Sequence, residues 1–562
     1  MNSLRAMKRI ARSALPRLYR KHLSTVNSNP PDTSLFENPG LEKPDLEKSD
    51  PLFSYTSGRW LWDEATQLRK RYQPFNVNEL KETAARSVNA KSCVKITKLP
   101  EGAYNKTFLL VMDDGVEVIA KIPNPYIPQK FATASEVATL DFLRNELDIP
   151  VPRVFAWSSR TDQPVGVEYI IMERAPGREL NKLWSAMDIS DRVDIVSQLV
   201  GIQTKIAAVD FHSYGSLFYR EDIEDGLHVP GIVDRFCIGP SCEVRFWEGE
   251  RRSMDQYRGP WTSSVAYAKD IARRERDWIM RFAKPRHPAD PLRQSESQES
   301  PDCHAELLGK YLEVVSYMIP SYEGQNRSVL WHPDLHSGNI FVDKNRIVSI
   351  IDWQGCSSLP IFYACRIPKF LKINGPFLFD LPPAAGLTSQ EKAENLRRYQ
   401  LTQLQRFYIS KFQEIDNDVF SALSFPQALT RQQLIDFAGY TWDDDGLFLL
   451  REMIHRTSRE WTVLTGLPQS SCSVRSDADA VASHIAEGKS WEDRQALFGA
   501  LGIPLDGWVY PEDFEAKAEA MRDLVSSVVE SADDKDGAKR ALRAWKLSES
   551  GPASLSGNLM DI

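Results

Sequence analysis

The sequence predicts an α+β fold of two lobes: a small antiparallel β lobe with one main helix, and a larger, mainly helical lobe. Short apolar runs separated by turn residues dominate positions 93–176, whereas apolar residues at helical spacing dominate positions 177–465. A third observation is a set of polar residues at fixed spacing between positions 332 and 353. Because 562 residues exceed the size of one ordinary core, more than one folded unit is expected.

The β lobe comes first along the chain. Asp113-Asp114-Gly115 is typical of a hairpin turn between two of its strands. A helix is expected from Phe131 to about Leu147, and it ends before Ile149-Pro150 because a residue that precedes proline disfavours helical geometry. Strands are expected at residues 94–99, 106–112, 116–122, 153–157 and 167–173.

The helical lobe begins after Gly177. Val193, Val196, Leu199 and Ile206 form an apolar stripe that predicts its first helix. We expect long ordered loops over residues 211–262, which are rich in Gly, Pro and aromatic side chains, and a flexible insertion near residues 284–303, which contain four prolines. Later helices are expected near residues 391–414, 430–438, 446–463 and 491–526.

Composition shifts divide the whole chain further. Pro, Ser, Glu and Lys dominate the stretch before the first aromatic cluster, and Ser, Asp and Lys dominate the end, so both are expected to be disordered. The predicted parts are a presequence (1–26), a linker (27–50), an N-terminal helical extension (51–92), the β lobe (93–176), the helical lobe (177–465), a C-terminal helical extension (466–530) and a disordered tail (531–562).

The first 31 residues carry seven Lys and Arg side chains and no acidic residue. Leu4, Met7, Ala11, Leu15 and Leu18 share one face of a helical wheel there, which is typical of a mitochondrial targeting segment. The alternative interpretation is a disordered basic tail. The targeting interpretation implies import into the mitochondrion, with the matrix as destination and the import machinery as a partner.

Charge and composition exclude other classes. The net charge is −8, and subtracting the seven positive charges of the first 31 residues leaves −15 on the remainder, which disfavours a general nucleic-acid surface. There is no run of 18 apolar residues, so a membrane span is not expected. The seven cysteines are scattered without a CxxC pair, so free thiols rather than a zinc site are expected.

The most informative segment runs from His332 to Ile340, His-Pro-Asp-Leu-His-Ser-Gly-Asn-Ile, and is followed by Ile-Asp-Trp at 351–353. It places Asp334, Asn339 and Asp352 at intervals of five and thirteen residues. Phosphoryl transfer needs one carboxylate to orient the acceptor hydroxyl, and an amide and a second carboxylate to hold Mg²⁺ against ATP. Apolar runs at 340–342 and 347–351, with a turn between them, predict a hairpin that carries these groups.

Residues 93–465 resemble the aminoglycoside phosphotransferase family, which has a bilobal protein-kinase-like fold. The HxDLHxGNI and IDW motifs carry the resemblance. The stretches 53–62, 71–77, 135–139 and 165–173 are further similar to the fungal altered inheritance of mitochondria protein 9 family. The resemblance implies ATP and Mg²⁺ as cofactors and a small hydroxyl-bearing acceptor.

The resemblance also implies residue roles. Asp334 matches the catalytic base, and Asn339 and Asp352 match the Mg²⁺ ligands. Lys121 matches the lysine that contacts the α and β phosphates, and Glu136 its ion-pair partner. The alternative interpretation is a strand-end lysine that reaches solvent and a solvated helix glutamate.

Other positions would support the nucleotide. His332 would brace the catalytic loop, and backbone groups of Glu173 and Ala175 would bind the adenine edge. The expected phosphate loop contains one glycine, where protein kinases have three, so a stiffer loop is expected. Its phosphate contacts would come from Gly102, Ala103 and Asn105.

Three functions are compatible with these features. The first is a mitochondrial ATP- and Mg²⁺-dependent phosphotransferase acting on a small molecule. The second is an ATP-binding pseudokinase or scaffold that supports mitochondrial maintenance or inheritance, and the third is a protein Ser/Thr kinase, which the lack of an APE segment after Asp352 disfavours. Asp443-Asp444-Asp445 beside Trp442 is either a site for a cationic acceptor or an acidic helix N-terminus.

Overall fold

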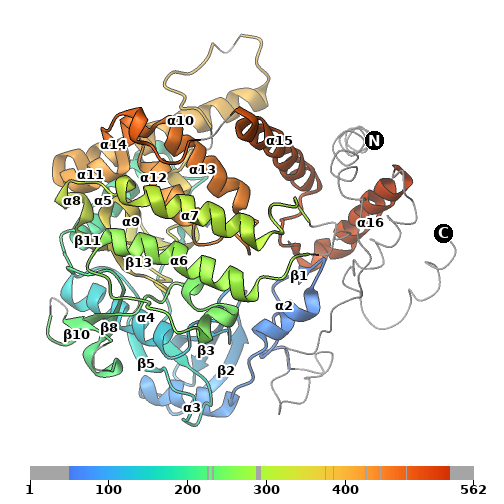
Figure 1. Cartoon of the computed structure of the whole chain (residues 1–562). Coiled ribbons are helices and arrows are strands. Elements are labelled where there is room, and N and C mark those ends of the chain that lie inside the picture. Colours follow the sequence, from blue (N-terminus) through green and yellow to red (C-terminus); the bar gives the residue numbers. More distant parts are fainter. Residues whose placement is uncertain are drawn as a thin grey trace.

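The computed structural model describes residues 50–531, except 225–226, 231–232, 287–292, 374, 384, 425–426, 444 and 476–477. The predicted presequence therefore lies outside the described residues, as do the linker except residue 50 and the tail except residue 531. Two lobes are evident in Figure 1, with the β lobe in blue to cyan below the helical lobe. The predicted α+β bilobal architecture is confirmed.

The β lobe is built on one antiparallel sheet with the strand order β2-β3-β4-β6-β5. Alternate side chains of β3 are buried, which is the pattern of a sheet with a covered face. Phe108 and Leu110 pack there against Leu80 of helix α3. The elements are α3 (Val77–Ser87), β2 (Cys93–Lys98), β3 (Asn105–Met112), β4 (Glu117–Pro123), β5 (Val154–Ser158) and β6 (Tyr169–Glu173).

Helix α4 (Phe131–Asp141) connects the β lobe to the helical lobe. Nearly all of its side chains are buried, and it continues into a π-helical turn, η2 (Phe142–Glu146). Ala138 and Leu140 belong to a core shared with helix α5 (Ile189–Ala207) and with the hairpin at residues 340–350. The element that bears Glu136 is therefore fixed from both lobes.

The helical lobe packs around two cores, one between α6, α7, α12 and α13 and one between α5, α9, α10 and α11. Tyr267 and Tyr311 are fully buried in the first core, and Tyr408 and Phe412 are fully buried in the second. The helices are α5 (Ile189–Ala207), α6 (Ser264–Phe282), α7 (Pro301–Met318), α8 (Glu323–Asn326), α9 (Ile361–Ala364), α10 (Ser389–Ile415), α11 (Asn417–Ser424), α12 (Ala428–Phe437), α13 (Leu447–Arg459) and α14 (Trp461–Thr465).

A hairpin separates Asn339 from Asp352, as predicted. Strand β12 (Ile340–Asp343) pairs with β13 (Arg346–Ile350), and Lys344 and Asn345 form the turn with positive φ angles of 46° and 59°. Strand β7 (Arg178–Glu179) adds to β12. The close approach requires glycine at 177, because an added Cβ would lie 2.6 Å from the Val342 carbonyl oxygen.

Three expected regions differ from the structure. Residues 211–262 contain a three-stranded sheet, not loops alone, made of β8 (Ser216–Tyr219), β9 (Val229–Pro230) and β10 (Phe236–Gly239). The end of the expected flexible insertion is ordered, because buried Gln298 bonds to residues 441 and 447 and Ser300 caps helix α7. The helix expected at 491–526 is two helices, α15 (Ala478–Leu501) and α16 (Phe514–Ser531), separated by a turn with Gly502, Pro504 and Gly507.

The two extensions meet each other. Strand β1 (Arg59–Trp60) pairs with β15 (Trp508–Val509), and Leu61 and Trp62 pack against Phe498 and Phe514. Helix α2 (Glu64–Arg71) follows β1. The remaining elements are β11 (Ser328–Leu330), β14 (Ser358–Pro360) and the 3-10 turns η3 (Leu180–Lys182), η4 (Arg220–Asp222), η5 (Val244–Phe246), η6 (Gly249–Ser253), η7 (Ser337–Asn339), η8 (Lys369–Leu371), η9 (Gln469–Ser471) and η10 (Pro511–Asp513).

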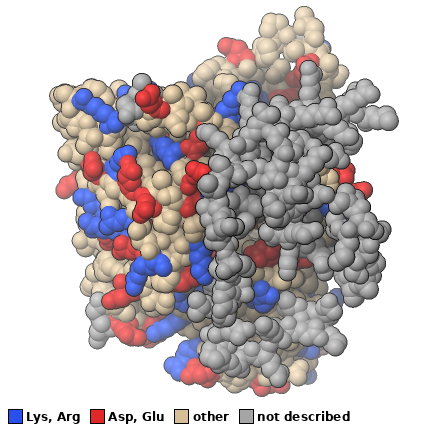
Figure 2. Space-filling view, turned by 45° about the vertical axis from the view of Figure 1, so that its right-hand side comes forward, with Lys and Arg blue, Asp and Glu red and all other residues tan. Residues whose placement is uncertain are grey.

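The surface is mixed in charge. Basic and acidic side chains are interspersed on the face seen in Figure 2. Within the described residues, no helix is both long and apolar enough to cross a membrane.

Candidate active site

The β lobe contributes a buried ion pair to the site. Lys121 on β4 places its Nζ 2.7 Å from Oε1 and 2.9 Å from Oε2 of Glu136 on α4. Burial alone would lower the pKa of Lys121, but the carboxylates of Asp352 and Glu136 outweigh it and raise that pKa. Burial raises the pKa of Glu136, and the charge of Lys121 opposes that rise. A buried charge of this kind persists only with partners, which Glu136 and Asp352 supply.

The helical lobe contributes Asp352, which closes the same cluster. Its Oδ1 lies 2.9 Å from Lys121 Nζ, so one ammonium group joins the two lobes. Lys121 lowers the pKa of Asp352 and keeps it ionised. Asp352 has a φ of 65°, in the left-handed region that is strained for a non-glycine residue. Strain of this kind gathers at functional sites, where it aims a side chain.

His332 links the two aspartates of the motif. Its Nδ1 accepts a hydrogen bond from the Asp334 N–H at 3.1 Å, and its Nε2 contacts the Ile351 carbonyl oxygen at 2.9 Å. Burial lowers the pKa of His332, which favours the neutral ring that this arrangement needs. The ring also lies 4.6 Å from that of Trp353, centroid to centroid. His332 thus holds the backbone at both ends of the motif.

Asn339 is held between the same two segments. Its Nδ2 donates to the Asp334 carbonyl oxygen at 3.0 Å, and its own carbonyl oxygen accepts from the Ile351 N–H at 3.0 Å. The residue is buried, so its side chain has a fixed orientation. The amide oxygen of Asn339 and the carboxylate of Asp352 are hard donors carried by adjacent backbone, and this donor set suits Mg²⁺.

The expected phosphate loop is tied down at its base. Asn105 Nδ2 donates to Gln354 Oε1 at 2.6 Å, which connects β3 to the residue two positions after Asp352. The Ala103 carbonyl oxygen accepts from Asn124 Nδ2 at 2.9 Å and from the Tyr126 hydroxyl. Gly102 and Ala103 are themselves exposed. The loop is therefore positioned by side-chain contacts to its flanks while its tip faces solvent.

The expected hinge lies at the end of β6. Glu173 donates its N–H to the Arg153 carbonyl oxygen at 2.8 Å, so that amide is engaged with β5. Its carboxylate accepts from the Arg153 N–H at 3.1 Å and lies 3.3 Å from Arg144 Nη1. Ala175 is half-buried two residues further on. Of the Glu173 backbone groups expected at the adenine edge, the N–H is therefore already bonded within the sheet.

Lys369 is a site residue that sequence reasoning missed. Its Nζ lies 2.6 Å from Asp334 Oδ1, and both side chains are accessible, at 68% and 48% exposure. The residue follows Asp352 by 17 positions, in a segment with no recognisable motif. Its location became evident only from the packing of turn η8 beside the catalytic loop.

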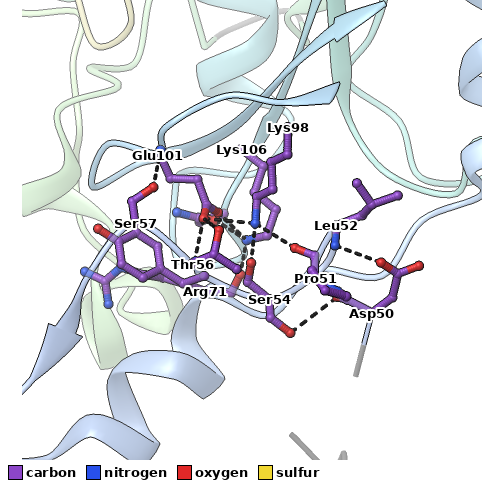
Figure 3. A network of polar contacts seen from close by, with 12 residues as sticks. Asp50, Pro51, Leu52, Ser54, Thr56, Ser57, Arg71, Lys98, Glu101 and Lys106 are labelled. Atoms are coloured by element: carbon purple, nitrogen blue, oxygen red, sulfur yellow. Dashed lines mark hydrogen bonds and ion pairs between the residues drawn. The ribbon is translucent and has the colours of Figure 1, made fainter. Parts of the chain in front are cut away.

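A second buried lysine network lies behind the phosphate loop and was also missed (Figure 3). Lys106 Nζ donates to Asn124 Oδ1 at 2.9 Å and to the Arg71 carbonyl oxygen, and lies 3.7 Å from Glu101 Oε1. Glu101 Oε2 accepts from the Thr56 N–H at 2.8 Å. The N-terminal extension is thereby fastened to the start of the phosphate loop.

The acidic run near residue 443 is engaged elsewhere. Asp443 pairs with Arg251 at 2.8 Å, and Asp445 pairs with Arg286 at 2.9 Å. The run precedes helix α13, as the helix-terminus interpretation expects, and Asp444 lies outside the described residues. The described part of the chain holds no group of three or more His, Cys, Asp or Glu side chains arranged for a metal. The seven cysteines are free.

Comparison with known proteins places this geometry in a family. Residues 95–363 match the phosphotransferase enzyme family. A subtelomeric hrmA-associated cluster protein of Aspergillus fumigatus is 32% identical over 487 residues, which cover 78% of this chain and 94% of that protein. The chain belongs to the aminoglycoside phosphotransferase family.

Other relatives of the chain carry the name altered inheritance of mitochondria protein 9, mitochondrial. The protein of Yarrowia lipolytica is 26% identical, over 81% of this chain and 84% of that protein. The protein of Saccharomyces cerevisiae strain YJM789 is 22% identical, over 74% of this chain and 79% of that protein. The resemblance to this group, expected from the sequence, is confirmed.

Solved structures of kinase-like enzymes resemble the chain more distantly. A thermostable mutant of an aminoglycoside phosphotransferase has 14% sequence identity and a TM-score of 0.37, over 68% of this chain and 99% of the other. A fructosamine-3-kinase from Thermobifida fusca, described as putative in its source, has 13% identity and a TM-score of 0.37, over 68% of this chain and all of the other.

Proposed function

We propose that this protein is a mitochondrial ATP- and Mg²⁺-dependent phosphotransferase that acts on a hydroxyl group of a small molecule. The observation that carries the proposal is the ion pair between Lys121 and Asp352, at 2.9 Å, which brings together one lobe's phosphate-binding lysine and the other lobe's metal-binding carboxylate. Asp334 and Asn339 lie beside it on the same braced backbone. The aminoglycoside phosphotransferase family supports the reaction class.

Each residue has a defined task in this proposal. Bound Mg²⁺, held by Asn339 and Asp352, would neutralise phosphate charge. Lys121 contacts the phosphates of ATP, and Glu136 keeps its ammonium group in place. Asp334 accepts the proton of the acceptor hydroxyl. The acceptor oxygen then bonds to the transferred phosphorus as the bond from phosphorus to ADP breaks. His332 fixes the direction of Asp334 through its backbone.

We place the protein in the mitochondrion, in the matrix. The acid-free, basic and amphipathic start of the chain supports this placement, as do the names of its relatives. A fusion of residues 1–40 to a fluorescent reporter should be imported into mitochondria, by way of the import machinery. A cytosolic distribution of the fusion would contradict the placement.

Nucleotide binding is tested first. Calorimetric titration of ATP should give binding that depends on Mg²⁺ in the wild type and is lost in Asp352→Ala, because the phosphates lose their bridging cation. Asp343→Asn is the matched control, since this exposed carboxylate lies on the same hairpin. Equal Mg²⁺-dependent affinity in the wild type and Asp352→Ala would refute the metal assignment.

Turnover is tested separately, in a strain that lacks the protein. Asp334→Asn is nearly isosteric and should keep folding and ATP binding, while proton acceptance is lost, which typically lowers the rate by about 10²–10⁴-fold. The variant should therefore fail to complement, with its import and abundance confirmed. Complementation equal to wild type would show that phosphoryl transfer is not the required activity.

A nucleotide-binding scaffold without turnover is the second candidate. The observation in its favour is the phosphate loop, which has a single glycine and is tied to Asn124, Tyr126 and Gln354. Loops of this kind move less, and a fixed loop suits binding better than rapid turnover. The complementation result for Asp334→Asn decides between the two candidates.

A further inference from the structure

The acceptor side of the catalytic loop carries a cation that the motif does not include. We propose that Lys369 is a further catalytic residue, whose ammonium group contacts the phosphoryl group as it passes from ATP to the acceptor held at Asp334. The inference rests on the proposed function. Its structural basis is the contact of 2.6 Å between Nζ of Lys369, whose side chain is 68% exposed, and Asp334 Oδ1, an oxygen that is itself buried.

The position of Lys369 does not depend on its side chain. The Lys369 N–H donates to the Leu335 carbonyl oxygen at 3.0 Å, which anchors turn η8 to the residue after Asp334. Leu371, fully buried in the helical lobe, holds the other end of the turn. An ion pair this exposed contributes little to stability. The ammonium group is thus delivered beside Asp334 by backbone and apolar contacts, and its charge is available to a ligand.

A cation at this location would stabilise the charge that develops during the transfer. In the transfer, the bond from the acceptor oxygen to phosphorus forms, the bond from phosphorus to the ADP oxygen breaks, and the acceptor proton moves to Asp334. Negative charge spreads over the three equatorial oxygens of the phosphoryl group meanwhile. Lys121 is committed to Glu136 and Asp352 on the nucleotide side. Among the described residues, Lys369 is the cation that pairs with Asp334, where we place the acceptor.

The test uses a mimic of the transferring phosphoryl group, so that no acceptor needs to be known. The full-length protein is titrated with Mg²⁺-ADP in the absence and presence of fluoroaluminate. Lys369→Met should weaken binding of the fluoroaluminate complex at least tenfold and Mg²⁺-ADP alone less than threefold. Lys369→Arg, which keeps the charge, should stay within about threefold of wild type for both ligands. Lys372→Met, in the same exposed segment, should match wild type.

Each other outcome has a defined meaning. Equal fluoroaluminate affinity in the wild type and Lys369→Met would overturn the role of Lys369 and leave the proposed function intact. An equal loss for both ligands would also overturn it, since the side chain would then act on nucleotide binding or folding in general. Absence of Mg²⁺-ADP binding in the wild type would overturn the proposed function, and this inference with it.

Discussion

Two lysines on neighbouring strands of the β lobe are both buried, and their pKa values shift in opposite directions. Lys121 on β4 faces Glu136 and Asp352. Lys106 on β3 lies against the N-terminal extension (Figure 3). The pKa of Lys121 is raised, whereas burial lowers the pKa of Lys106 to about 8. The partners explain the difference, because two carboxylates lie within 2.9 Å of Lys121 Nζ, while the carboxylate of Glu101 lies 3.7 Å from Lys106 Nζ.

The comparison shows how the partners of a buried lysine determine the direction of its pKa shift. Lys121 is paired with two carboxylates, those of Glu136 and Asp352. Lys106 has mainly neutral acceptors, the Arg71 carbonyl and Asn124 Oδ1, and Lys98 and Arg71 further lower its pKa. A group of this second kind fixes the chain that it binds. It holds residues 54–71 against the phosphate loop.

The largest effect is expected from replacement of Lys121. Lys121→Met leaves the buried Glu136 carboxylate without its cation, which should lower the free energy of unfolding by about 3–5 kcal/mol. Mg²⁺-ATP affinity should fall at least tenfold. Chemical denaturation and calorimetric titration measure the two effects. The double variant Lys121→Met/Glu136→Gln should recover stability without recovering binding, and recovery of both would break the comparison.

Replacement of Lys106 should lower the stability of the protein and leave nucleotide binding nearly unchanged. Lys106→Met leaves the Arg71 carbonyl and Asn124 Oδ1 without a donor, which should lower the free energy of unfolding by about 2–3 kcal/mol. Mg²⁺-ATP affinity should change less than threefold in the same titration. A loss of nucleotide binding as large as that of Lys121→Met would show that the two networks are one site.

The pH dependence of stability separates the two lysines further. The pKa of Lys106 is about 8 when folded and 10.5 in its ordinary range, so the unfolded chain binds more protons between these values and stability rises with pH there. The wild type should gain about 2 kcal/mol over Lys106→Met between pH 8 and pH 10. The raised pKa of Lys121 implies stability present below pH 10.5 and lost above it. A wild-type advantage that stays flat from pH 8 to 10 would contradict the Lys106 assignment.

The smallest effect is expected from replacement of Asn105. Asn105 precedes Lys106 and points to the opposite face of β3, where it bonds to Gln354. Asn105→Ala should lower Mg²⁺-ATP affinity by about three- to tenfold and the free energy of unfolding by less than about 1 kcal/mol. If Asn105 had a purely structural role, the loss of stability would be the larger effect and the loss of Mg²⁺-ATP affinity the smaller one. Thr107→Ala on the same strand provides the control.

Much of the site could be read from the sequence because its parts are local. Asp334 and Asn339 lie on one loop, and a hairpin with a two-residue turn carries the chain from Asn339 to Asp352. Lys121 and Glu136 are joined by one strand-to-helix connection. The spacing along such short elements fixes which side chains converge. The sheet of the β lobe follows for a similar reason, since its apolar runs and turns alternate along the chain.

Contacts between distant segments required the tertiary structure. Lys369 reaches Asp334 because turn η8 packs beside the catalytic loop, and Glu101 meets Thr56 because the extension folds back on β3. The short strands β8 to β10 also exist only through pairing with one another. By itself, the sequence determined the strands, the hairpin and the motif residues, whose geometry depends on neighbours along the chain. Only the packed structure decided the acceptor-side cation and the second lysine network, because no periodicity or spacing encodes which surfaces of separate elements come into contact.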